Sequence, residues 1–76
     1  MIAYHVTSQK KFLKYVRSGF IEPPVRAWSN ISSAESFSKQ TGRRVILRLR
    51  VTDFEALEGH KGQAIIVNER VSVEGF

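Results

Sequence analysis

Polar and apolar residues alternate with a period of two in several short segments of the chain, and this alternation is typical of β-strands. The N-terminal segment IAYHVT places three large side chains on one face and Ala3, His5 and Thr7 on the other. The segment RRVILRLRV alternates apolar residues with arginines in the same way. The predicted strands are residues 2–7, 25–29, 43–51, 63–67 and 71–73.

A first helix is predicted directly after the N-terminal strand. Ser8 is a good N-cap because its hydroxyl can accept from a free amide of the first turn. The helix is expected to run to residue 18 and to end at Gly19 in the left-handed conformation. Its apolar face is expected to hold Phe12, Leu13 and Val16. Its polar face is expected to be a solvated stripe of Lys10, Lys14 and Arg17.

Two capping-box patterns, in which a hydroxyl residue is followed three positions later by glutamate, predict further helical starts. Ser32 and Glu35 indicate a second helix that ends near Gly42. Thr52 and Glu55 indicate a short helical turn before the next strand. The expected fold is therefore α+β: a compact single domain over residues 1–76, with two main helices and a small mixed sheet.

Composition narrows the class of protein. The chain of 76 residues has no cysteine, which excludes disulfides and thiolate metal sites and favours the cytoplasm. The two histidines are too far apart in the sequence to suggest a metal site. No apolar run approaches the ~20 residues of a membrane span. The net charge of +5 fits a nucleotide, a nucleic acid or an acidic protein as partner, and also a merely solvated basic surface.

The order and spacing of several short motifs resemble the ADP-ribosyltransferase superfamily. These motifs are YHVT at residues 4–7, a helix that ends at Gly19-Phe20, Trp28-Ser29, a helix near Ala34, and RVILRL at residues 44–49. The resemblance implies an ADP-ribosyltransferase-like core with NAD in a cleft between two halves of the sheet. It implies that His5 and Thr7 lie against NAD, that Trp28 stacks on the nicotinamide, and that Ser29 supplies the adjacent hydroxyl.

The sequence departs from the superfamily at the catalytic position. Active transferases carry a glutamate on a late strand, and Gln63 stands at the matching place. An amide carries no charge to stabilise an oxocarbenium-like transition state. Glu58 or Glu69 could serve instead if the alignment shifts by a loop. The resemblance therefore implies a minimal domain that binds NAD or a related nucleotide, with weak or no transferase activity.

Each of these residues also has a structural interpretation. His5 could be a neutral histidine satisfied by the backbone, and Trp28 could be an anchor of a small core. A second functional hypothesis is a basic domain without enzymatic activity. It would bind nucleic acid or an acidic protein through the strand face that carries Arg44, Arg48 and Arg50, together with the stripe of Lys10, Lys14 and Arg17. Pairing of these arginines with Glu69 or Glu74 would remove that function. A third hypothesis is a homodimer formed by edge strands.

Overall fold

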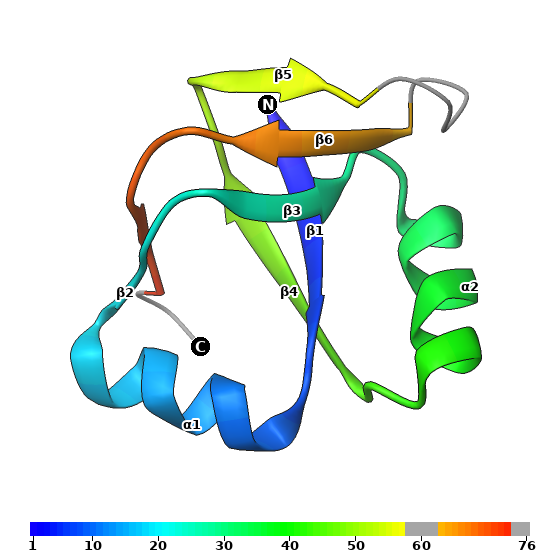
Figure 1. Ribbon diagram of the computed structural model, residues 1–76, viewed down its shortest axis with the longest axis horizontal. Coiled ribbons are helices and arrows are strands. Elements are labelled where there is room, and N and C mark those ends of the chain that lie inside the picture. The colour runs from blue at the N-terminus through cyan, green and yellow to red at the C-terminus, as the bar shows by residue number, and fades with distance from the viewer. Residues whose placement is uncertain (58–62, 74–76) are drawn as a thin grey trace.

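The computed structural model describes residues 1–57 and 63–73 and has an α+β fold with two helices (Figure 1). The strands are β1 (Ile2–Thr7), β2 (Phe20–Ile21), β3 (Val25–Trp28), β4 (Val45–Arg50), β5 (Phe54–Ala56), β6 (Ala64–Val67) and β7 (Val71–Ser72). The helices are α1 (Gln9–Ser18) and α2 (Ile31–Thr41). The expected α+β class with two main helices is confirmed.

Five strands form one sheet in the order β4-β1-β3-β6-β5, and β2 pairs with β7 in a separate two-stranded sheet. Every strand pair in the described residues is antiparallel, so the prediction of a mixed sheet is wrong for this part of the chain. The reason lies in the placement of β1. The strands β3 and β4, joined by α2, run parallel to each other, but β1 lies between them and is antiparallel to both.

The sheet consists of two parts that meet at one residue pair. β1 pairs with β4 over six residues, and β3 pairs with β6 over four. Between β1 and β3 the register contains only Tyr4 opposite Trp28. In Figure 1 the strands β1 and β4 accordingly run across the direction of β3, β5 and β6.

The N-terminal helix begins and ends as its local sequence predicts. The Ser8 hydroxyl accepts from the Lys11 amide at 3.2 Å, and Gly19 caps the other end with φ of 85°. The predicted apolar face is partly wrong, because Phe12 packs on the core whereas Leu13 is 53% exposed and Val16 is 51% exposed. Tyr15, one turn after Phe12, takes the core-facing place. The aromatic ring of Tyr15 buries a large apolar area although tyrosine carries a polar hydroxyl, so the sequence pattern did not place it on the apolar face.

The second helix begins earlier than the serine pattern predicts. The side-chain oxygen of Asn30 accepts from the amides of Ser32 and Ser33 at 2.7 and 3.2 Å. Asn30 is therefore the N-cap, and the predicted Ser32 capping box is wrong. Asparagine and serine cap about equally well, so local preference alone does not decide between them. Gly42 ends the helix with φ of 73°, as predicted.

The main core lies on the α1 side of the sheet. Its buried residues are Ala3, Ile21, Val25, Ala27, Leu47, Leu49, Val51, Ile65, Val67, Val71 and Val73. On the other side α2 covers part of the sheet and buries Ala34 completely. The short strands β2 and β7 contribute Ile21 and Val71 to the core and hold the end of α1 against it.

The segment after β4 forms a strand instead of the predicted helical turn. Residues 54–56 form β5 and pair with β6 at the edge of the sheet. The Glu69 carboxylate accepts from the Thr52 amide at 2.6 Å and from the Thr52 hydroxyl at 2.9 Å. It also accepts from the Asp53 amide at 3.3 Å. A distant glutamate thus accepts from the Thr52 amide, which in the predicted capping box would donate to the Glu55 side chain.

We predict that Asn30→Ala lowers the free energy of unfolding by about 1 kcal/mol, because two amides of α2 lose their side-chain acceptor. Chemical denaturation measures the change. The matched control is Ser32→Ala, since the Ser32 hydroxyl makes no hydrogen bond to the described residues. We expect the control to stay within about 0.5 kcal/mol of the wild type. A larger loss in the serine variant than in the asparagine variant would contradict the cap assignment.

We also predict that Glu69 makes the fold sensitive to acid. Hydrogen bonds from the Thr52 amide, the Thr52 hydroxyl and the Asp53 amide lower the pKa of Glu69 from its ordinary value of 4.5. A carboxylate with a lowered pKa stabilises the fold above that ordinary value and loses its contribution as the pH falls through the folded-state pKa. The thermal unfolding midpoint of Glu69→Gln should be lower than that of the wild type at neutral pH. The difference between the two midpoints should become smaller in acid. Glu55→Gln should show neither effect.

Candidate functional site

The divergence of β1 and β3 leaves a gap that the His5 side chain bridges. Past the Tyr4–Trp28 pair, the two strands no longer form a backbone ladder. The Nδ1 atom of His5 lies 2.6 Å from the carbonyl oxygen of Arg26 on β3. Because a carbonyl oxygen only accepts, His5 Nδ1 carries the proton and donates it. A side chain thus replaces a hydrogen bond between the strands.

This bond determines what the other nitrogen of His5 can do. With the proton on Nδ1, the neutral ring presents Nε2 as an acceptor. Nε2 is buried and has no hydrogen-bond partner among the described residues. Burial lowers the pKa of His5 below its ordinary value of 6.5, and the nearby cations Lys11 and Arg43 lower the pKa further. The hydrogen bond to Arg26 acts in the opposite direction but is outweighed. Nε2 is therefore a buried acceptor that the described residues leave unpaired.

His5 lines a cavity of about 270 Å³ between the diverging strands and α2. The lining residues are His5, Val6, Arg26, Ala27, Trp28, Phe37, Arg43, Leu57 and Ala64. The rings of Trp28 and Phe37 lie 5.6 Å apart at an angle of 47° and form an aromatic wall. Arg26 and Arg43 are exposed and supply positive charge, and none of the lining residues that the structure describes is acidic. The cavity is thus suited to an anionic ligand with a flat ring.

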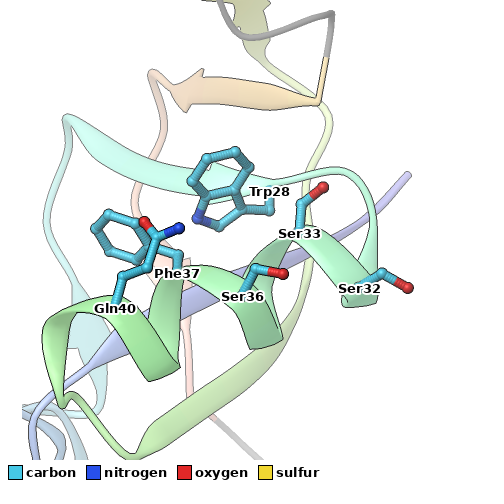
Figure 2. A pocket seen from close by; sticks show the side chains of 6 residues that line it. All are labelled: Trp28, Ser32, Ser33, Ser36, Phe37 and Gln40. Carbon is cyan, nitrogen blue, oxygen red and sulfur yellow. The ribbon is translucent and has the colours of Figure 1, made fainter.

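Trp28 also borders a second, shallow pocket of about 290 Å³ on α2. Figure 2 shows the Trp28 indole above the helix, with the Phe37 ring and the Gln40 side chain to one side of it. Ser32, Ser33 and Ser36 complete this pocket along the helix. It contains no charged group, and we therefore take the first cavity as the candidate site.

Ser29 and Gln63, which the sequence assigned to the same site, lie together beside Trp28. The Ser29 amide donates to the Gln63 carbonyl oxygen at 2.7 Å. The Ser29 hydroxyl lies 3.2 Å from both the carbonyl oxygen and the side-chain Oε1 of Gln63. Gln63 does not line the cavity, although its neighbour Ala64 does. The Gln63 amide oxygen is therefore engaged by Ser29 at the edge of the site.

Thr7 lies apart from the cavity. Its side chain is buried at 1% exposure, and its hydroxyl has no hydrogen-bond partner among the described residues. Thr7 shares a strand face with His5 but is not one of the cavity residues. The structure thus brings His5 and Trp28 together, with Ser29 and Gln63 alongside, and leaves Thr7 outside.

The arginines of the second hypothesis lie elsewhere. Arg48 and Arg50 are exposed on β4, and Arg44 is exposed in the connection before that strand. None of them forms an ion pair with a described residue. The ion pair found among the described residues joins Arg70 to Glu22 at 2.9 Å. Glu69, one proposed partner, binds Thr52 instead. Glu74, the other, lies outside the described residues, as does Glu58. Lys10, Lys14 and Arg17 are exposed on α1, as expected of a solvated stripe.

Of the nine described cavity residues, only His5 and Trp28 were predicted from the sequence as site residues. Arg26, Phe37 and Arg43 are the charged and aromatic ones among the rest. One signal was available for Arg26, because it stands two residues before Trp28 and therefore on the same strand face. Phe37 and Arg43 gave no such signal. They reach the cavity because α2 and the turn after Gly42 fold back over β1, which is a tertiary contact.

No family model, no curated protein and no solved structure matches the chain. Within residues 1–57 and 63–73, no group of three histidine, cysteine, aspartate or glutamate side chains could hold a metal ion. Neither helix of the described chain has the length and apolar character needed to cross a membrane. Function therefore has to be inferred from the site itself.

We predict that His5 makes the fold less stable as the pH falls below about 6.5. The unfolded chain binds a proton at this histidine more readily than the folded chain does, because burial lowers the folded-state pKa. The free energy of unfolding should therefore fall between about pH 6.5 and pH 5, where Glu69 is still charged. His5→Asn keeps a side-chain donor and removes the titration, so its stability should be flatter over this interval. An NMR titration of the His5 ring that gave a pKa above 6.5 would contradict the prediction.

Proposed function

We propose that the chain is a minimal ADP-ribosyltransferase-like domain that binds NAD or a closely related nucleotide in the cavity between β1, β3 and α2. The observation that carries this proposal is the presence of His5 and Trp28 in one cavity. The two residues come from different strands, and the resemblance to the superfamily assigns both of them to NAD. Their proximity follows from the antiparallel pairing of Tyr4 with Trp28.

The charges around the cavity favour a phosphate-bearing ligand. Arg26 and Arg43 border the cavity, and Lys11 is close enough to affect the pKa of His5. A guanidinium group offers a planar set of donors that matches two oxygens of a phosphate. No described residue of the lining carries a negative charge to compete for these cations.

The aromatic wall and the volume define which part of a nucleotide enters. Trp28 and Phe37 offer ring faces against which a nicotinamide or a nucleobase can stack. Ligand cavities commonly measure ~300–1,000 Å³, and this one is slightly smaller. We infer that a ring and part of its ribose enter the cavity, while the phosphates lie at its mouth near Arg43. The buried Nε2 of His5 then accepts a hydrogen bond from the ligand.

The same residues favour binding over transfer. Loss of nicotinamide develops positive charge on the ribose, which a nearby carboxylate stabilises in active enzymes. The lining residues that the structure describes include no carboxylate, and the Gln63 amide oxygen lies 3.2 Å from the Ser29 hydroxyl. Glu69 is held by Thr52 and Asp53. We therefore expect weak or no ADP-ribosyl transfer and no appreciable release of nicotinamide.

The test is a titration of the full chain with NAD, monitored by NMR and by calorimetry. We expect chemical-shift changes at His5, Trp28 and Phe37, and nicotinamide release no faster than without protein. Arg43→Gln should weaken binding about tenfold, because a charged hydrogen bond to phosphate is lost.

The matched control is Arg17→Gln, which removes the same charge from the outer face of α1 and should leave NAD affinity unchanged. Equal losses of NAD affinity in the two variants would mean that NAD responds only to the net charge of the protein. The absence of shifts at millimolar NAD would refute the binding proposal. Nicotinamide release that is faster with the protein than without it would contradict the expected lack of transfer, because the described lining residues supply no carboxylate to support it.

A further inference from the structure

The outer edge of β4 is a second candidate binding surface, which combines unpaired backbone groups with exposed arginines. It does not depend on the cavity. β4 is the first strand of the sheet, so β1 pairs with one of its edges and no described strand pairs with the other. An unpaired edge exposes a row of backbone donors and acceptors and is a template for another strand. Six residues of regular strand, Val45–Arg50, make this edge long enough to accept one.

The register shows which backbone groups point outward. The Met1 and Val51 backbones exchange two hydrogen bonds, at 2.9 and 3.1 Å. In an antiparallel ladder, bonded and non-bonded pairs alternate. The odd-numbered residues of β4 are therefore bonded to β1, and the N–H and C=O groups of Ile46, Arg48 and Arg50 point toward the free edge.

The side chains of the same residues provide the charge of this surface. Arg48 and Arg50 are exposed and stand on one face of β4, opposite Tyr4 and Ile2 of β1. Neither arginine has an acidic partner in the described part of the chain. Ile46 stands on the same face and is half-buried. A strand added at this edge would meet two positive charges and then an apolar side chain.

These charges also exclude one occupant. Two copies of the chain that paired through β4 in antiparallel orientation would bring Arg48 opposite Arg48, or an arginine opposite a neighbouring arginine. Like charges directly opposite each other destabilise a strand pair. Arginines on an edge strand thus act against self-association. The free edge of β4 can therefore accept another strand, but its arginines disfavour a strand that carries positive charge.

We propose that the free edge of β4 binds an extended acidic peptide segment of a partner protein by adding it as an antiparallel strand. The orientation follows the other pairs of the sheet, all of which are antiparallel. In this register the peptide places one acidic residue opposite Arg50, a second opposite Arg48 two positions later, and an apolar residue opposite Ile46. The recognised pattern is acidic-x-acidic-x-apolar, held by main-chain hydrogen bonds and specified by the arginines.

The experiment uses the full chain and a fluorescent peptide that contains Glu-Thr-Glu-Thr-Val. We expect saturable binding and, in hydrogen exchange by NMR, slower exchange of the Ile46, Arg48 and Arg50 amides. The Leu47 and Leu49 amides already bond to β1 and should not change. A peptide of the same composition with adjacent glutamates, Glu-Glu-Thr-Thr-Val, should bind about tenfold more weakly, because one carboxylate then points to the opposite face.

Charge reversal tests the pairing itself. The double variant Arg48→Glu, Arg50→Glu should lose the acidic peptide and gain affinity for Lys-Thr-Lys-Thr-Val. The matched control Lys10→Glu, Lys14→Glu changes the net charge equally on α1 and should retain the preference for the acidic peptide. Both arginines are exposed, so thermal unfolding of the double variant should remain cooperative.

Three outcomes would overturn the proposal. One is binding of the two glutamate peptides with equal affinity, which would indicate attraction to net charge alone. Another is binding without slower exchange of the outward amides, which would locate the peptide away from the edge. The third is binding of a single-stranded oligothymidylate at this face without binding of the peptide, which would make the arginines a nucleic-acid surface.

Discussion

The junction between β1 and β3 is the constraint on which the rest of this domain depends. The two strands share one residue pair, Tyr4 with Trp28, and then diverge. At this point β1 offers the carbonyl of Arg26 no backbone partner. The His5 side chain supplies the missing donor. A leucine at position 5 would fill the space but leave this carbonyl unsatisfied.

The same junction bears on both interpretations of His5, the structural one and the proposed ligand-binding one. Nδ1 has a structural role, because its hydrogen bond to the Arg26 carbonyl oxygen links β1 to β3 where the backbone pairing ends. Nε2 is left as a buried acceptor without a partner among the described residues, and the lowered pKa favours the neutral ring. The structural and the ligand-binding interpretations of this histidine are therefore compatible. They concern different nitrogen atoms of one ring, and the first role sets the tautomer that the second requires.

Strand β1 also separates two surfaces that carry exposed arginines. Where β1 leaves β3, the gap is lined by Arg26 and Arg43. On its other side β1 pairs with β4 without interruption, and that regular ladder holds Arg48 and Arg50 in fixed alternation at the edge. The irregular pairing of β1 with β3 thus leaves a cavity. The regular pairing of β1 with β4 leaves a straight outer edge to which another strand could pair. The net charge of +5 is thereby distributed over sites of different geometry.

The sequence by itself determined the features that depend on neighbours in the chain. Alternation located β1 and β4, and Ser8, Gly19 and Gly42 marked helix ends, because caps and pleats are local. Tertiary structure decided whether Asn30 or Ser32 caps α2 and whether Thr52 begins a helix, since distant groups such as Glu69 compete for the same amides. It also decided that the sheet is antiparallel and that Phe37 and Arg43 meet His5. Strand direction and the path of a helix over the sheet depend on which surfaces bury each other, and no single segment of sequence contains that information.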